Sequence, residues 1–404
     1  MLGLDILTSL IEFISLVFSF RDFSLFDGSQ QQQQPQLKLS PPLAPPEPFQ
    51  QIISGFYSVP PVIAIHDRHG TIQWAFTRED ASAQILPNAT QHNLYTLAND
   101  ATEVKWINEG KSIAAVFGDL LLIITYAPGT SNDKQITFAV PRHETSLVNA
   151  HTLEPLPGGK VAVTTTGQRE WDGILVYDAN APLVDDPPIL QNITGLRAIH
   201  GMIWDETEQI LWAAGTDVAA DGSDNIPAYN TIQGYPFDPN TGLLDADNKT
   251  PFYKVNQAYD LDTEWGQGFP WWSGAHDLVP IPNKRKLLMT TDTDLFIFDL
   301  SLRQFTLSGS DVVDTYLPGF EPTSDDRYGV GRNAQYIELP RCDIKSASLA
   351  PDGSFLYVQS GWQRDQSNGT NIVVDGHRTV LEEGHLIYRS RFFADIPGWE
   401  KPKS

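Results

Sequence analysis

Residues 148–166, VNAHTLEPLPGGKVAVTTT, carry a motif that recurs along the chain. The motif is a polar residue, a short apolar strand, a tight turn and a second apolar strand. Further copies are LRAIHGMIWDETEQILWAAGT (196–216), SGAHDLVPIPNKRKLLMTTD (273–292), CDIKSASLAPDGSFLYVQSG (342–361) and, more distantly, TEVKWINEGKSIAAVFGD (102–119). Repeats of about 40–50 residues built from several short strands are typical of a β-propeller. The sequence therefore predicts an all-β fold, a β-propeller with five visible repeats and five to seven blades.

The rest of the chain agrees with this fold class. Short β-branched and aromatic runs alternate with Pro, Gly, Asn and Asp, and there is almost no helical periodicity. We expect insertions at about 216–231, 258–273 and 308–334. Residues 62–76, VIAIHDRHGTIQWAF, are expected to be outer strands that close the ring with the carboxyl-terminal blade. A β-sandwich is the alternative.

Three segments are expected. Residues 1–28 start with an apolar stretch that Asp5 and Glu12 interrupt, which suggests an imperfect signal peptide or an amphipathic segment. Residues 29–51 are rich in Gln and Pro and are predicted to form a tether, and residues 52–400 the propeller domain. Four Asn-x-Ser/Thr acceptor sites agree with export, so we expect a secreted, extracellular glycoprotein.

Charge and cysteine content narrow the function classes. The chain has 50 acidic and 27 basic residues, a formal net charge of −23. Such a surface disfavours nucleic acid, whose phosphates need basic contacts, and it disfavours anionic membrane surfaces for the same reason. The single cysteine, Cys342, excludes intrachain disulfides and a cysteine-based zinc site. We expect that thiol to be inert.

The repeat makes a geometric prediction. A polar residue opens each copy, and the first strand of each blade is the innermost in a propeller, so these residues are expected to form a ring around the axis. They are Lys105, His151, His200, His276 and Lys345. The alternative for each histidine is a structural role beside a strand.

Two kinds of chemistry suit such a ring. His151, His200 and His276 could bind a divalent metal, Ca or Mn. Alternatively, the histidines and lysines could bind an anionic group such as a uronate and supply a general base and acid near neutral pH. The two lysines favour the second chemistry, because ammonium groups repel a metal cation.

Aromatic and Arg residues in the inter-blade loops are candidates for substrate binding, since aromatic rings stack on sugars and Arg clamps carboxylates. These candidates are Arg169, Trp271, Trp272, Arg332, Tyr336 and Arg364.

The motifs at 149–166, 199–215 and 274–292 resemble a group of fungal and bacterial propeller proteins over about residues 55–395. That group is similar to the rhamnose–glucuronate lyases, which remove terminal rhamnose from the glucuronate of plant arabinogalactan by β-elimination. More distantly, the histidine cluster is similar to that of oligogalacturonate lyases, propellers with a histidine-bound metal. The resemblance implies a polysaccharide lyase with His151, His200 and His276 in its active centre. The two ring lysines depart from an all-histidine metal site.

The implied partner is a plant cell-wall or gum polysaccharide with acidic sugars, and we expect a monomer. One alternative is a non-catalytic propeller that binds glycans or a protein partner, because this fold also serves as an interaction platform. Another is a glycoside hydrolase with paired carboxylates.

Overall fold

The computed structural model describes residues 49–393, except 97, 143–146, 148, 167–172, 218–228, 256–273, 324–326, 331–333 and 362–366, and except the side chains of 382 and 383. The chain divides into two compact units, residues 1–38 and 39–404, and every described residue belongs to the second. The predicted segment 1–28 and nearly all of the predicted tether therefore lie outside the described residues. Strand β1 (Gln51–Tyr57) begins one residue before the expected domain start.

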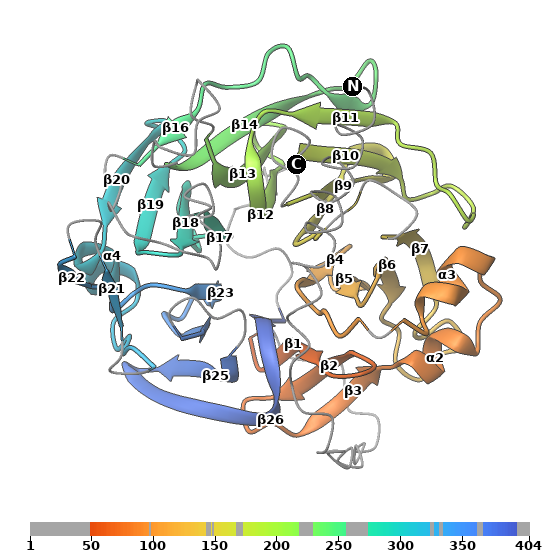
Figure 1. Ribbon diagram of the computed structural model, residues 1–404, viewed down its shortest axis with the longest axis horizontal. Helices are drawn as coiled ribbons and strands as arrows, with labels where there is room; N and C mark the ends of the chain where they lie inside the picture. The colour runs from red at the N-terminus through yellow and green to blue at the C-terminus, as the bar shows by residue number, and fades with distance from the viewer. Residues whose placement is uncertain are drawn as a thin grey trace, which may run out of the picture. The chain divides into compact units, whose positions relative to one another are not determined.

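The described strands form antiparallel blades around a common axis, which confirms the β-propeller (Figure 1). Blade 1 holds β4 (Val104–Ile107), β5 (Ser112–Phe117), β6 (Leu120–Thr125) and β7 (Ile136–Pro141). Blade 2 holds β8 (Leu153–Leu156), β9 (Lys160–Thr164), β10 (Gly173–Asp178) and β11 (Gln191–Thr194). Blade 3 holds β12 (Arg197–Asp205), β13 (Ile210–Thr216), β14 (Asn230–Asp238), β15 (Leu243–Leu244) and β16 (Tyr253–Lys254). Blade 4 holds β17 (Ala275–Pro280), β18 (Lys286–Thr291), β19 (Leu295–Asp299) and β20 (Gln304–Ser308).

One long strand, β26 (His377–Phe392), joins the last two blades. Its first part pairs with β25 (Ser367–Val374) and completes blade 5, which also contains β23 (Ile344–Leu349) and β24 (Phe355–Gln359). Its second part pairs with β1 and becomes the innermost strand of blade 6, which continues through β2 (Val62–Asp67) and β3 (Ile72–Phe76). The described strands thus make six blades, and residues 62–76 are the predicted closing strands.

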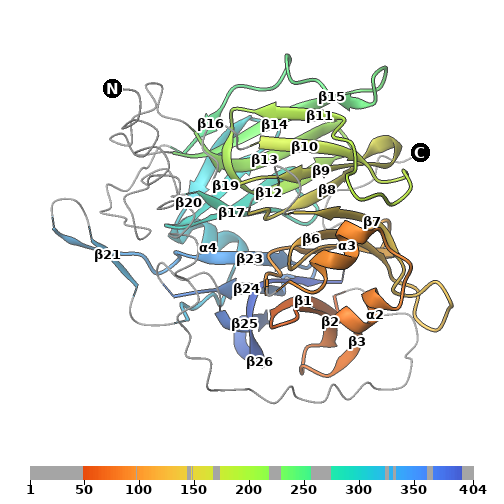
Figure 2. The same cartoon turned by 45° about the vertical axis from the view of Figure 1, so that its right-hand side comes forward.

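The helices and one hairpin lie in the connections. Helices α2 (Arg78–Ser82) and α3 (Asn88–Asn93) link blade 6 to blade 1, and the 3-10 turn η2 (Pro157–Gly159) links β8 to β9. Helix α4 (Ser310–Tyr316) and the hairpin of β21 (Tyr328–Val330) and β22 (Tyr336–Glu338) lie between blades 4 and 5. Figure 2 shows β21 reaching out from the side of the fold. No helix in the described part of the chain has the length and apolar character needed to cross a membrane.

Apolar side chains fill the space between neighbouring blades, because each blade packs its two faces against the blades on either side. One cluster joins blade 3 to blade 4 through Trp212, Met289 and Phe298, all fully buried. Near the axis the inner strands approach so closely that Gly201 has no room for a side chain. A Cβ there would lie 2.5 Å from the backbone nitrogen of Leu278 in the next blade.

Candidate functional site

The inner strands of blades 3, 4 and 5 share a local irregularity at their ring residues. The register in which each inner strand pairs with the second strand of its blade shifts at one point. The shifts lie between Arg197 and Gly201, between Ala275 and Asp277, and between Ile344 and Ser346. His200, His276 and Lys345 fall inside these shifts. A bulge of this kind re-aims a side chain out of the regular alternation of a strand. The sequence repeat at these three positions is therefore also a structural repeat.

His151 and His200 form a close pair, with ring centroids 4.0 Å apart. Their Nδ1 atoms lie 2.8 Å from the carbonyl of Asn149 and 2.7 Å from that of Ala198. A carbonyl only accepts, so each Nδ1 carries the proton and each Nε2 keeps a lone pair in the neutral ring. Burial lowers the pKa of both imidazoles well below the ordinary value, and neighbouring charges such as Arg389 add to this shift. Both rings are therefore neutral bases near pH 7.

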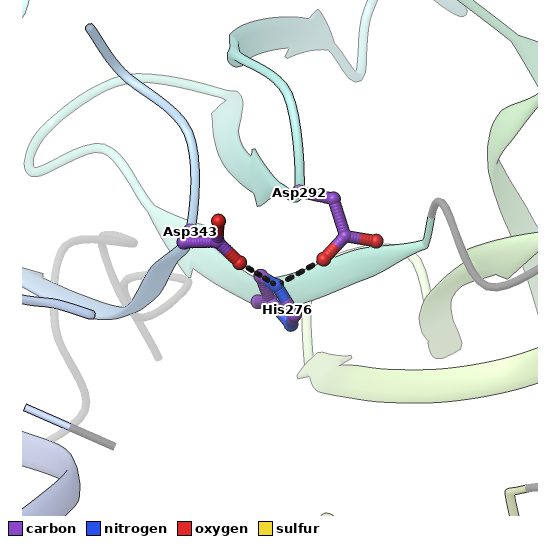
Figure 3. A group of neighbouring side chains, drawn as sticks. All are labelled: His276, Asp292 and Asp343. Carbon is purple, nitrogen blue, oxygen red and sulfur yellow. Dashed lines mark ion pairs between the residues drawn. The ribbon is translucent and has the colours of Figure 1, made fainter. Parts of the chain in front are cut away.

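His276 lies 5.8 Å from His200, measured between ring centroids, in a more strongly charged setting. Its Nε2 is 2.6 Å from Asp292 Oδ1 and 3.6 Å from Asp343 Oδ1 (Figure 3). The Lys345 ammonium lies 2.9 Å from the same Nε2 and 3.0 Å from Asp343 Oδ1. Burial alone would raise the pKa of Asp343, but Lys345 and the hydrogen bond from His276 outweigh it and lower the pKa. Asp343 is therefore ionised.

His276, Asp292 and Asp343 are the described residues whose ligand atoms come close enough to share a metal, within 4.8 Å of one another. One imidazole and two carboxylates are a donor set that a divalent cation accepts. The Lys345 ammonium, however, contacts two of the three donors and repels a second cation. The group does not fit a metal while Lys345 is in place. The metal site formed by three histidines stays a prediction.

The expected ring position of Lys105 is wrong by three residues. The Thr102 hydroxyl donates to the carbonyl of Ala150, so Thr102 lies level with the start of the blade 2 strand. Lys105 instead contacts Glu154, with 2.7 Å between Nζ and Oε2, and the carbonyl of Met202 at 3.1 Å. Thr102 and Lys105 are both polar residues near the start of β4, and the sequence match chose Lys105 instead of Thr102. Lys105 still faces the axis, but further along it than the histidines.

Blade 6 adds two residues that the sequence reasoning missed. Opposite Gly55, the pairing of β26 with β1 shifts, and Tyr388 and Arg389 occupy the shift. The Tyr388 ring centroid is 5.5 Å from that of His151, and the Lys345 ammonium lies 6.0 Å from it. The available signal was the pair Arg389-Ser390, which matches Lys345-Ser346 in blade 5.

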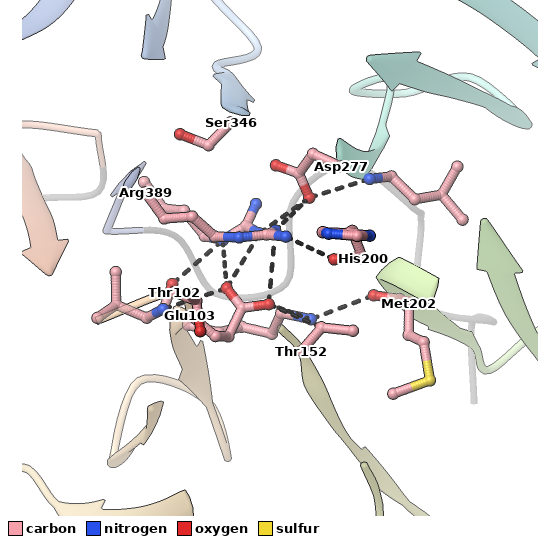
Figure 4. A network of polar contacts seen from close by, with 12 residues as sticks. Thr102, Glu103, Thr152, His200, Met202, Asp277, Ser346 and Arg389 are labelled. Atoms are coloured by element: carbon pink, nitrogen blue, oxygen red, sulfur yellow. Dashed lines mark hydrogen bonds and ion pairs between the residues drawn. The ribbon is translucent and has the colours of Figure 1, made fainter. Parts of the chain in front are cut away.

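Beside the histidines lies a buried charge network, which is shown in Figure 4. Arg389 lies 2.8 Å from Asp277 and 3.5 Å from Glu103, and Arg391 lies 3.0 Å and 3.2 Å from the same two carboxylates. Burial by itself would raise the pKa of Glu103 and of Asp277, but the two guanidinium groups and Lys105 lower both. The carboxylates are therefore ionised and paired.

The candidate substrate-binding residues lie elsewhere. Tyr336 is on β22 and is 79% exposed, in the hairpin that lies beside α4 at the outer edge of Figure 1. The structure does not bring it to the histidines. The other candidates lie outside the described residues: Arg169, Trp271, Trp272, Arg332 and Arg364. Cys342 is buried against Arg327, and burial raises the pKa of its thiol to about 12; that the thiol is inert stays a prediction.

Fold and site together define a six-bladed β-propeller that gathers histidines and a lysine at one end of its axis. No family model and no curated protein matches the chain. Solved structures with a similar fold include a chain of the nidogen–laminin complex, with 9% identity, TM-score 0.47, and coverage of 85% of this chain and 99% of that one. A protein of unknown function from Desulfotomaculum acetoxidans has 9% identity, TM-score 0.47 and coverage of 86% and 97%. Hydrazine synthase from Kuenenia stuttgartiensis has 11% identity, TM-score 0.43 and coverage of 80% and 77%.

Proposed function

We propose that the protein is a lyase that cleaves a glycosidic bond next to a uronate by β-elimination, with the rhamnosyl-glucuronate of plant arabinogalactan as the substrate class. The observation that carries the proposal is the pair of neutral imidazoles of His151 and His200, whose Nδ1 protons are held by backbone carbonyls. Such a pair presents basic Nε2 atoms beside an ammonium group, the combination that proton abstraction next to a carboxylate requires.

The reaction balances without a co-reactant. A base removes the proton on C5 of the uronate, the bond between C4 and its oxygen breaks, and a double bond forms between C4 and C5. The leaving oxygen takes a proton and departs with the released sugar. The carboxylate must be neutralised for the C5 proton to become acidic, and a positioned cation provides this.

Within this proposal each residue has a distinct task. Nε2 of His151 or of His200 accepts the C5 proton. The Lys345 ammonium, which is 1% exposed, faces the uronate carboxylate in surroundings where its charge is weakly screened. Tyr388 lies within reach of both His151 and Lys345 and can return a proton to the leaving oxygen.

The test is incubation with gum arabic while the ultraviolet absorbance of the conjugated, unsaturated uronate is recorded. Wild-type protein should produce this signal, and His151→Gln and His200→Gln should each lose at least about a hundredfold in kcat. His92→Gln is the matched control, since His92 is an exposed residue of α3. If the wild type cleaves the substrate and both His151→Gln and His200→Gln keep full activity, the assignment is overturned.

The same experiment separates the other functions. A hydrolase would release sugar without the absorbance, and a binding protein would retain glycan without cleaving it. The face of the hairpin that carries Tyr328 and Tyr336, 50% and 79% exposed, favours a binding role for that part of the fold. A secreted glycoprotein would meet plant cell-wall or gum polysaccharide outside the cell, and we include this location in the proposal.

A further inference from the structure

Arg389 is a fully buried side chain that contacts the backbone of two ring residues. One of its terminal nitrogens donates to the carbonyl of His276 at 2.8 Å and also to the carbonyl of His200. The other terminal nitrogen pairs with Asp277 at 2.8 Å. A planar guanidinium in a fixed fork geometry holds such partners in one arrangement. Arg389 therefore ties the inner strands of blades 3 and 4 together at the histidines.

These carbonyls belong to the irregular parts of the strands. The regular pairing of β12 with β13, and of β17 with β18, is interrupted at His200 and His276. A carbonyl at such a point needs another donor, since a buried and unpaired backbone group is costly. Arg389 supplies that donor, and it comes from β26, the last of the described strands.

We infer that Arg389 is a positioning residue that sets the orientation of the His200 and His276 imidazoles from the closing strand β26. The inference rests on the proposed function only for its kinetic consequence. Because Arg389 acts on the backbone of two blades at once, the histidine arrangement forms only when β26 has closed the ring. The site is thus completed by residues at the far end of the chain.

Arg391 provides a matched control. It pairs with the same two carboxylates as Arg389, at 3.2 Å from Glu103 and 3.0 Å from Asp277. Its Nε atom donates to the carbonyl of Val104, at 3.1 Å, rather than to the carbonyl of a histidine. Arg391→Lys therefore disturbs the same charge network but leaves the histidine carbonyls bound.

The experiment compares Arg389→Lys with Arg391→Lys in the full chain. The nine histidines are labelled with ¹³C in the ring, and their resonances are assigned with single His→Gln variants. Arg389→Lys should move the His200 and His276 signals, while Arg391→Lys leaves them in place at a similar loss of thermal stability. This readout needs no substrate, so it stands even if lyase activity is not found.

If lyase activity is found, kcat should fall at least about tenfold in Arg389→Lys, with a smaller change in KM. In Arg391→Lys, kcat should fall less than about twofold.

Should Arg389→Lys not fold, the charge-balanced Arg389→Gln/Asp277→Asn variant takes its place in the same spectra. Unchanged His200 and His276 signals in a folded Arg389 variant, or equal changes in both single variants, would overturn the inference.

Discussion

The ammonium nitrogen of Lys345 lies 2.9 Å from Nε2 of His276, although 69 residues separate them in the chain. Both atoms face Asp343, whose Oδ1 is 3.0 Å from the ammonium. The buried carboxylates of Asp292 and Asp343 thus have a cation beside them that is a side chain of the protein itself.

Removing Lys345 should turn the group of His276, Asp292 and Asp343 into a metal site. Without the ammonium, two buried carboxylates face each other across an imidazole, which destabilises the fold until another cation binds. Lys345→Met should therefore have a lower Tm than wild type, and MnCl2 should raise that Tm by mass action. Differential scanning calorimetry with and without the metal measures both effects.

Lys286→Met is the control for this experiment. Lys286 pairs with Asp299 at 3.1 Å on β18 and β19, in blade 4, which also holds His276. MnCl2 should raise the Tm of Lys345→Met more than it raises the Tm of Lys286→Met or of the wild type. An equal effect of the metal on all three proteins would contradict the prediction.

Acid should destabilise the fold through His151 and His200. Their pKa values lie well below the ordinary value of 6.5, mainly because of burial, so the unfolded chain binds protons that the folded chain does not. Stability is then lost as the pH falls below the unfolded pKa, by at most about 1.4 kcal/mol per pH unit for each histidine. Urea unfolding at pH values from about 7 to about 5 measures this slope.

The His151→Gln/His200→Gln double variant should have a shallower slope in the same series. An equal slope in the double variant and the wild type would assign the acid sensitivity to other groups.

Lys105 should matter for stability rather than for the orientation of the histidines. Its ammonium pairs with Glu154, and their side chains are 12% and 9% exposed. Lys105→Met would leave a buried carboxylate with no cation at 2.7 Å, which should cost about 3 kcal/mol in the free energy of unfolding. Lys111→Met, which breaks an exposed pair with Glu109, should have little effect in the same urea titrations. Equal losses in the two variants would contradict this interpretation of Lys105.

Gly201 should tolerate no side chain. A Cβ at this position would lie 2.5 Å from the nitrogen of Leu278 and 2.9 Å from the carbonyl carbon of Asp277, and backbone atoms cannot move aside cheaply. Gly201→Ala should therefore lower the free energy of unfolding by about 1–3 kcal/mol. Gly274→Ala is the control, because its nearest neighbour would be 3.4 Å away. If chemical denaturation finds the two variants equally stable, the close approach of blades 3 and 4 is not what requires this glycine.

Much of the fold and part of the site could be predicted from the sequence. The repeated strand–turn–strand motif predicted the propeller, and its opening residues predicted that His151, His200, His276 and Lys345 would share one end of the axis. The prediction failed for Lys105, because Thr102 and Lys105 are both polar residues near the start of β4 and both fit the motif. Only the contacts between neighbouring inner strands reveal which of them is level with the histidines.

The sequence by itself determined the kind of fold and the chemistry available at the ring, because both follow from local patterns that repeat. Tertiary structure alone decided that the predicted closing strands form a separate sixth blade, which combines strands from the two ends of the described chain and has no contiguous repeat. It also decided that Lys345 fills the position between His276 and Asp343, and that Arg389 binds the backbone of two histidines. Such contacts depend on how blades distant in sequence meet at the axis.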